Sequence, residues 1–425
     1  MDHSDDRDAL AERFLRVRTG TEALALPLSA EDQQLQSMPD ASPTKWHRAH
    51  TSWFFEEFLL GPAGVPPIDE HYRYLFNSYY DAVGPRHARP RRGILSRPCA
   101  DEITAYRRAV DGRMVELLRG LDEGRLEEIR PLVALGLAHE EQHQELILTD
   151  ILHAFSESPL LPAVRPAGER PELGPESSPP LAFVEFAGGV VEIGAPPAAG
   201  FRFDNEGPRH RVFLEPFAIA SRPISVAEVR AFIEAGGYRR SALWLSEGYE
   251  HARRQDREAP ACLRLDGGRA LMFGVDGERE ALDDEPACHL SYYEADAVAR
   301  FLGGRLPTEH EWEHVAARSD PSRGNFRESG ALRPRPACDG DVAVRQLFGD
   351  VWEWTASAYA AYPGFRPATG AVGEYNGKFM VNQMVLRGGS CFTPRGHVRV
   401  SYRNFWHPGT FFQMTGARMA RSLDS

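Results

Sequence analysis

The sequence of 425 residues has few cysteines, no long apolar run and an excess of acidic over basic side chains. Its five cysteines are widely spaced and form no C-x-x-C pair, which excludes a disulfide framework and a zinc ribbon. A run of about 18 apolar residues is missing, so we expect no membrane-spanning helix. The formal net charge of −12 argues against nucleic acid and anionic membranes as partners, because a negative field repels polyanions. An acidic N-terminus without an apolar signal segment completes the prediction of a cytoplasmic protein that acts on small molecules.

One segment of the chain is especially rich in proline. Seven prolines lie between Pro159 and Pro180, a density that neither a helix interior nor a central strand tolerates. We therefore predict a helical domain over 1–155, a Pro-rich linker over 156–181 and a second domain over 182–425.

Apolar residues recur at helical spacing in four segments of the first domain, which predicts a four-helix bundle. The segments are 8–24, 44–60, 101–118 and 131–155. The last helix is expected to begin with Pro131 at its first position, where a missing N–H costs nothing.

The second domain has the pattern of an α+β fold with much irregular chain. Alternating apolar and polar residues over 181–194 predict a β-hairpin. Three short helices are expected, over 225–238, 291–304 and 308–318, the first of them ended by a Gly-Gly pair.

The strongest chemical signal is a set of spaced histidines. His139 and His143, in H-E-E-Q-H, stand at i and i+4 and therefore lie on one face of the predicted helix. A third histidine from W-H-R-A-H-T, either His47 or His50, would complete three neutral nitrogen ligands and leave coordination positions open for catalysis. The alternative is a group of solvated surface histidines, helped by neighbours such as Glu140.

The same helix formally matches the H-E-x-x-H pattern of zinc metalloproteases, with Glu140 as general base. The long form of that pattern fails, because L-I-L-T lacks the Gly and the third His. A glutamate ligand further downstream would fall in the Pro-rich linker, where no helix can present it.

The loop-like stretch 62–98 carries two further groups that could take part in chemistry. The pair Tyr79 and Tyr80 could donate a proton or an electron beside a metal, or could be half-buried loop aromatics. The arginines within 86–92 could bind carboxylates bidentately, or could form a solvated basic loop.

Several motifs of the second domain resemble the formylglycine-generating-enzyme-like sulfatase-modifying domain, a variant of the C-type lectin fold. They are F-D-N-E-G-P-R-H (203–210), R-L-P-T-E-H-E-W-E (305–313), F-G-D-V-W-E-W-T (348–355), V-L-R-G-G-S (385–390), Y-R-N-F (402–405) and G-A-R-M-A-R (416–421). Joined to W-H-x-A-H-T and H-E-x-Q-H of a DinB-like helix bundle, the set resembles the sulfoxide synthases of ergothioneine biosynthesis. The resemblance covers nearly the whole chain and implies an α+β multidomain protein.

The resemblance implies a non-haem iron(II) ion, Fe(2+), bound by His50, His139 and His143, with His47 as a neighbour. Members of this family use O2 to join a thiol to C2 of the imidazole of hercynine (Nα-trimethylhistidine), which gives a sulfoxide. L-cysteine is the expected sulfur donor. γ-Glutamylcysteine or a selenium compound is the alternative donor, and an O2-independent thiol transferase of the DinB type is the alternative enzyme.

The resemblance also implies roles for individual side chains. Gln142 would hydrogen-bond the substrate imidazole, and the pair Tyr79 and Tyr80 would supply a proton. Arg89 and Arg92 would hold the carboxylate of cysteine.

Further matches lie near the end of the chain. Asn404 and Phe405 match positions that hold hercynine, and the aromatic face can attract its quaternary ammonium. Relatives read Y-R-N-F-F-P-P where this chain has Y-R-N-F-W-H-P, so Trp406 and His407 are expected to alter the pocket wall. A lectin-like binding module without catalysis is a competing class. Formylglycine generation is disfavoured, because Cys391 has no second cysteine nearby and is expected to be structural.

Overall fold

The computed structural model of the chain describes residues 3–165, 177–197, 200–338, 342–369 and 371–423. The chain divides into two compact units: Met1–Val164 with Ala368–Tyr375, and Arg165–Pro367 with Asn376–Ser425. Much of the predicted linker, residues 166–176, lies outside the described residues. No helix in the described ranges is long and apolar enough to cross a membrane.

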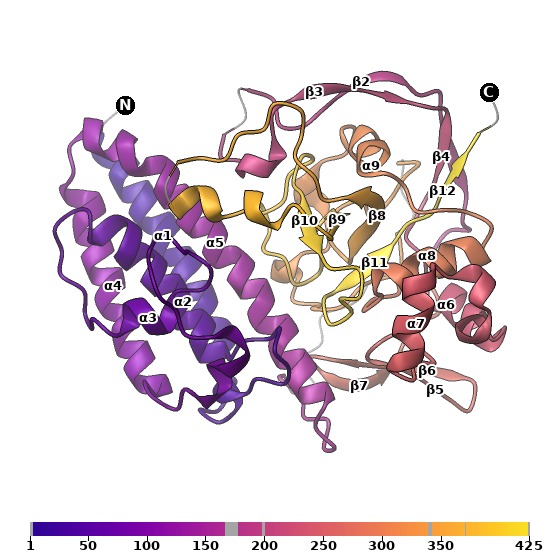
Figure 1. Cartoon of the computed structure of the whole chain (residues 1–425), viewed down its shortest axis with the longest axis horizontal. Helices are drawn as coiled ribbons and strands as arrows, with labels where there is room; N and C mark the ends of the chain where they lie inside the picture. The colour runs from indigo at the N-terminus through magenta and orange to yellow at the C-terminus, as the bar shows by residue number, and fades with distance from the viewer. Residues whose placement is uncertain (1–2, 166–176, 198–199, 339–341, 370, 424–425) are drawn as a thin grey trace. The chain divides into compact units, whose positions relative to one another are not determined.

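The first unit is built from four long helices, as the apolar spacing predicted (Figure 1). Helices α1 and α2 each pack against both α4 and α5, so the apolar stripes of all four meet in one core. A short helix, α3, lies between α2 and α4 in the chain. The bounds are α1 His3–Ala25, α2 Thr44–Phe55, α3 Tyr72–Phe76, α4 Ala100–Gly120 and α5 Glu123–Ser156.

Helix α2 is the central element of this unit, since every one of its residues is buried. Its α-helical hydrogen bonding ends at Phe55 and a π-helical turn, Glu56–Leu60, follows, where the sequence predicted one uninterrupted helix to residue 60. The Glu56 carbonyl accepts the N–H of Gly61, five residues on, at 2.8 Å. Such a turn holds one extra residue and commonly marks a functional region.

Helix α5 begins eight residues earlier than predicted. Asp122 caps it, its side chain accepting the N–H of Arg125 at 2.9 Å, so Pro131 lies inside the helix rather than at its first position. Proline in a helix interior removes one backbone hydrogen bond at a cost of about 3 kcal/mol. A good cap and a long buried face outweigh that cost here, and the prediction of the helix start was wrong for this reason.

The second unit combines four small sheets with short helices. The sheet orders are β1-β4-β12, β10-β9-β8-β11, β2-β3 and β5-β6-β7, and all pairs are antiparallel except β8 with β11. The strands are β1 Phe183–Phe186, β2 Gly189–Ile193, β3 His210–Leu214, β4 Phe217–Ala220, β5 Leu263–Asp266, β6 Arg269–Gly274, β7 Gly277–Glu280, β8 Trp352–Ala358, β9 Met384–Arg387, β10 Asn404–Trp406, β11 Thr415–Ala417 and β12 Ala420–Ser422.

The hairpin predicted over 181–194 is wrong in its pairing, although both strands exist. Strand β1 pairs with β4, and β2 pairs with β3. Gly188 between them has a positive φ of 72°, and a Cβ there would lie 2.3 Å from the carbonyl oxygen of Leu214. The chain therefore turns against the end of β3, and the two strands enter different sheets.

The three helices predicted in the second unit are confirmed, each within the expected segment. Ser225, Ser291 and Thr308 cap them through their side chains, and the left-handed Gly236 follows the first of them. Their bounds are α6 Val226–Glu234, α8 Tyr292–Phe301 and α9 Glu309–Ala316; a fourth helix, α7, spans Ser246–Arg254.

The motif residues of this unit form buried ion pairs. Arg387 and Arg403 both donate to Glu309, at 2.9 Å to the same carboxylate oxygen. Arg418 donates to Glu353 at 2.8 Å. All five side chains are buried, so these motif positions maintain the fold of the second unit. Burying such charges is tolerable only because each is paired and hydrogen-bonded.

Candidate metal centre

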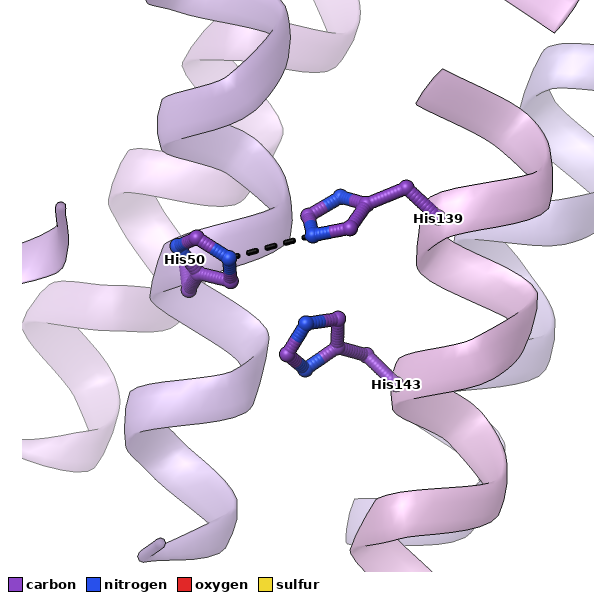
Figure 2. Close-up of side chains that lie close together, drawn as sticks. All are labelled: His50, His139 and His143. Carbon is purple, nitrogen blue, oxygen red and sulfur yellow. Dashed lines mark hydrogen bonds between the residues drawn. The ribbon is translucent and has the colours of Figure 1, made fainter. Parts of the chain in front are cut away.

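Three histidines of the first unit converge on one point. His50 comes from α2, whereas His139 and His143 come from successive turns of α5, and Figure 2 shows the three rings turned toward one another. One nitrogen from each lies within 4.8 Å of the others, and Nε2 of His50 is 3.1 Å from Nε2 of His139. The i, i+4 spacing and the third histidine expected from W-H-R-A-H-T thus produce a group of three.

The surroundings of the cluster are apolar and fix the ring of His50. This ring lies between the indoles of Trp46 and Trp53, with centroids at 4.6 and 5.4 Å. Its Nδ1 lies 2.6 Å from the carbonyl oxygen of Phe76. A carbonyl only accepts, so Nδ1 carries the proton and the lone pair of Nε2 faces the other histidines.

Burial keeps the three rings neutral. It lowers the pKa of His139 to about 3, and it lowers the pKa values of His50 and His143 well below the ordinary histidine range. Neutral imidazole is the form that binds a metal ion. Three buried neutral nitrogens facing one space fit a borderline divalent ion such as Fe2+ or Zn2+, and leave coordination positions for small ligands.

The metal-free protein should lose stability as the pH falls from 7.5 to 5.5. The folded-state pKa values lie below this window, so only the unfolded chain takes up protons there, and protonation favours unfolding. With an unfolded pKa near 6.5, the three rings together should lower the free energy of unfolding by roughly 4 kcal/mol. Urea titrations at the two pH values measure this. Because other histidines contribute to the measured loss as well, the His139→Ala variant should lose about 1.4 kcal/mol less than the unaltered protein. An unchanged loss in that variant would contradict the assignment.

His47, the other histidine of the W-H-R-A-H-T motif, lies beside the cluster. Its Nδ1 is 2.7 Å from Nδ1 of His143, and its Nε2 is 3.0 Å from the carboxylate of Asp150. It stands outside the group of three nitrogens that face one another.

Glu140 faces away from the histidines, into the core between α1, α4 and α5. Its carboxylate accepts hydrogen bonds from Thr21 at 2.6 Å, Arg107 at 2.8 Å and Arg18 at 2.8 Å. Burial alone would raise the pKa of Glu140, but the charges of Arg18 and Arg107 outweigh it and lower the pKa to about 2. A carboxylate held this way cannot act as the general base of a metalloprotease. The match to H-E-x-x-H therefore does not indicate a metalloprotease site.

Tyr375 is a site residue that the sequence did not reveal. It follows Gln142 by 233 residues, yet its hydroxyl donates to Oε1 of Gln142, and its ring centroid lies 5.9 Å from that of His139. Its neighbour Glu374 accepts the backbone N–H groups of Asp81 and Ala82 at 3.0 and 2.9 Å. The short segment G-E-Y-N-G has no periodicity or motif that would mark it in the sequence.

The predicted tyrosine pair lies next to this segment. The hydroxyls of Tyr79 and Tyr80 are 3.4 Å apart, and the rings of Tyr79 and Tyr375 have centroids at 6.3 Å. Tyr80 is fully buried, and burial raises its pKa well above the ordinary value. Tyr80 therefore stays protonated at any physiological pH.

The two predicted arginines differ in their surroundings. Arg89 is exposed and donates to the carbonyl of Asp40. Arg92 is buried, stacks 3.3 Å from the centroid of the Trp46 ring, and donates to the hydroxyls of Ser42 and Ser78. In the described part of the chain, Arg92 forms no ion pair within 4 Å. Burial lowers its pKa, which is the mark of a cation that lacks a carboxylate partner.

Asn404, Phe405 and Trp406 belong to the second unit, where they form strand β10. All three are half-buried. The ring of Phe405 stacks on Tyr359 with centroids 4.0 Å apart, and Trp406 meets Phe412 edge to face at 5.6 Å.

The chain was compared with known families and proteins. Residues 13–147 match the DinB superfamily, and residues 170–341 and 324–423 match the sulfatase-modifying factor enzyme 1-like domain. Both matches confirm the predicted fold class, a helical unit followed by a sheet-rich one.

Curated relatives include hercynine oxygenases. The one from Mycolicibacterium thermoresistibile is 32% identical, with 98% of this chain and 96% of the relative covered. The one from Mycobacterium tuberculosis is also 32% identical, with 97% and 98% covered. Ergothioneine biosynthesis protein 1 of Schizosaccharomyces pombe is 27% identical over 52% of this chain and 28% of its own length.

Proposed function

The chain belongs to the hercynine oxygenases, a family of metal-dependent oxidoreductases, and from this premise we propose which reaction it catalyses. The enzyme joins the sulfur of L-cysteine to C2 of the hercynine imidazole and forms a sulfoxide, as a step of ergothioneine biosynthesis. One C–H and one S–H bond break, and a C–S and an S=O bond form. One oxygen atom of O2 enters the sulfoxide, and the other leaves as water with the two hydrogens.

The group of three histidines carries this proposal. His50, His139 and His143 would hold Fe(2+), with the buried aromatic rings around them excluding water. The ion would supply the one-electron chemistry that O2 requires and open positions for the thiolate. The preset lone pair of His50 Nε2 supports this assignment, because the ring needs no reorientation to bind the ion.

Gln142 and Tyr375 are the polar groups beside the histidines. We assign Gln142 to the hercynine imidazole, as the family resemblance implies, and Tyr375 to the movement of a proton. The hydroxyl hydrogen of Tyr375 is held on Oε1 of Gln142, next to the ring of His139, and Tyr79 and Tyr80 extend this group of phenols.

Arg92 is the best candidate to bind the carboxylate of the sulfur donor. Its buried guanidinium donates to the hydroxyls of Ser42 and Ser78 and forms no ion pair within 4 Å among the described residues, so a substrate carboxylate would supply a direct countercharge. Arg89 is exposed and would contribute through its charge alone.

We further propose that Asn404, Phe405 and Trp406 bind hercynine. The stacked rings of Phe405 and Tyr359 form an aromatic face of the kind that attracts a quaternary ammonium group.

The reaction is tested by O2 uptake of anaerobically iron-loaded protein with hercynine and one thiol at a time. Uptake with cysteine, together with the mass of a cysteine–hercynine sulfoxide, is the expected result. Uptake only with γ-glutamylcysteine would correct the donor. A thioether formed without O2 would identify a thiol transferase instead, and no uptake with any donor despite bound iron would overturn the proposal.

The Tyr375→Phe variant should lower kcat for sulfoxide formation about 100-fold or more, because it removes the proton beside the metal ligands and keeps the ring. Iron content should remain unchanged. The matched variant Tyr80→Phe removes a phenol that lies one ring further away and should have a smaller effect. A loss confined to Tyr80→Phe would instead assign the proton transfer to the tyrosine pair that the sequence predicted.

A further inference from the structure

Behind His143 lies a chain of buried polar groups that the reaction proposed above does not use. Nδ1 of His143 is 2.7 Å from Nδ1 of His47, and Nε2 of His47 is 3.0 Å from Oδ2 of Asp150. The same oxygen accepts the backbone N–H of Ser42 at 2.8 Å. His47 and Asp150 are 2% and 6% exposed, so this chain is shielded from water.

The partners at its two ends set the direction of every hydrogen bond. Oδ2 of Asp150 accepts the N–H of Ser42, and Nε2 of His47 donates to the same oxygen. A neutral His47 that donates from Nε2 has no hydrogen on Nδ1, so its Nδ1 accepts. Nδ1 of His143 must therefore carry a proton, and the lone pair of His143 is left on Nε2, which faces His50 and His139 (Figure 2).

The three histidines of the cluster are held in different ways. His50 is fixed by a backbone carbonyl, whereas Nδ1 of His139 is buried without a hydrogen-bond partner. Among the described residues, His143 is the one of the three that is linked to a carboxylate, through His47. Such a link raises the basicity of a ligand imidazole and fixes its ring.

The burial of Asp150 is energetically unfavourable, and its packing alone does not explain why it is buried. Its second oxygen, Oδ1, is buried without a hydrogen bond, which is unfavourable for a polar atom. Arg92 is the cation whose charge acts on Asp150, and no ion pair within 4 Å joins the two in the described residues. A carboxylate kept in this state is typical of a residue retained for function.

We propose that His47 and Asp150 are positioning residues that hold His143 in the tautomer and orientation required to bind the metal ion. This inference rests on the proposed metal centre and extends it to two residues that touch neither the metal nor the substrate. It assigns His47, the first histidine of W-H-R-A-H-T, to the support of a ligand.

Titration of the metal-free protein with Co2+, followed by its visible absorption, tests the proposal without any turnover. His47→Leu and Asp150→Leu should each weaken Co2+ binding about 10- to 100-fold and change the absorption bands. Asp150→Asn should have a smaller effect, since its amide oxygen can accept both hydrogen bonds and only the charge is lost. The control is His153→Leu, a histidine of the same helix α5 that bonds Ser37 at 2.7 Å, and it should leave Kd unchanged.

A double variant distinguishes an effect that acts through His143 from a general loss of structure. If His47 acts only through His143, adding His47→Leu to His143→Ala should weaken Co2+ binding less than twofold further. A full additional loss in the double variant, or an unchanged Kd in folded His47→Leu and Asp150→Leu, would overturn the inference. If His143→Ala binds Co2+ as tightly as the unaltered protein does, the proposed metal centre itself is wrong.

Discussion

Alanine in place of His139 should abolish sulfoxide formation, with kcat reduced about 1000-fold or more. The substitution removes one of the three nitrogens that we propose to hold the metal ion. Loss of the proposed ion would remove the group that activates O2 in this reaction. Iron content and O2 uptake, measured on the same preparation, report the two effects separately.

His71→Ala is the matched control for this variant. His71 has a side chain 85% exposed and pairs with Asp69 at the surface, so both iron content and turnover should stay unchanged. Full iron loading with full turnover in His139→Ala would refute the assignment of the metal ligands.

Glutamine in place of Glu140 should destabilise the protein by about 3–5 kcal/mol. The change removes the buried carboxylate that Arg18 and Arg107 share, and the remaining partners of these two buried guanidinium groups, Asp111 and Glu22, are partly exposed. The core is then left with an excess of buried positive charge, which is costly. Urea unfolding of the metal-free variants measures the effect. The neighbouring Glu141 is half-buried rather than fully buried, and Glu141→Gln should change stability by less than about 1 kcal/mol.

This prediction also separates two interpretations of H-E-E-Q-H. A metalloprotease base would tolerate Glu140→Gln in the fold and lose peptide hydrolysis. A structural carboxylate would show a loss of stability, with any fall in sulfoxide formation following the unfolded fraction. Equal stability of Glu140→Gln and the unaltered protein would contradict the buried ion network.

The nearness of His139 and His143 could be predicted because it depends on local geometry, whereas the choice of His50 as their neighbour came from the family resemblance. Two histidines four residues apart share a helix face whatever the rest of the chain does, and the helix pattern around His139 and His143 was strong. Tyr375 could not be found this way, since its place beside Gln142 depends on the path of the chain over the intervening residues. The same holds for Glu140, because no spacing rule brings Arg18 and Arg107 to it.

The fold shows a similar division between local and long-range information. Helix caps such as Ser225 and Thr308 act within three residues, and the helices that they begin were predicted correctly. Strand partners are decided over longer distances, and the pairing of 181–194 was predicted incorrectly. The motifs that identify the second unit include Arg387 and Glu309, whose buried pairing explains their presence without any catalytic role.

Ala368–Tyr375 belongs to the helical unit, and this affects how the enzyme can be divided into fragments or chimaeras. A fragment ending at the Pro-rich segment would contain all three histidines but would lack Tyr375 and the glutamate that binds the N–H groups of Asp81 and Ala82. A chimaera made by exchanging halves with a relative would therefore take the loop around Asp81 and Ala82 from one parent. It would take residues 368–375, which bind that loop, from the other parent. A working hybrid should carry residues 368–375 from the parent that supplies the helices, so the unit of exchange is not a continuous piece of gene.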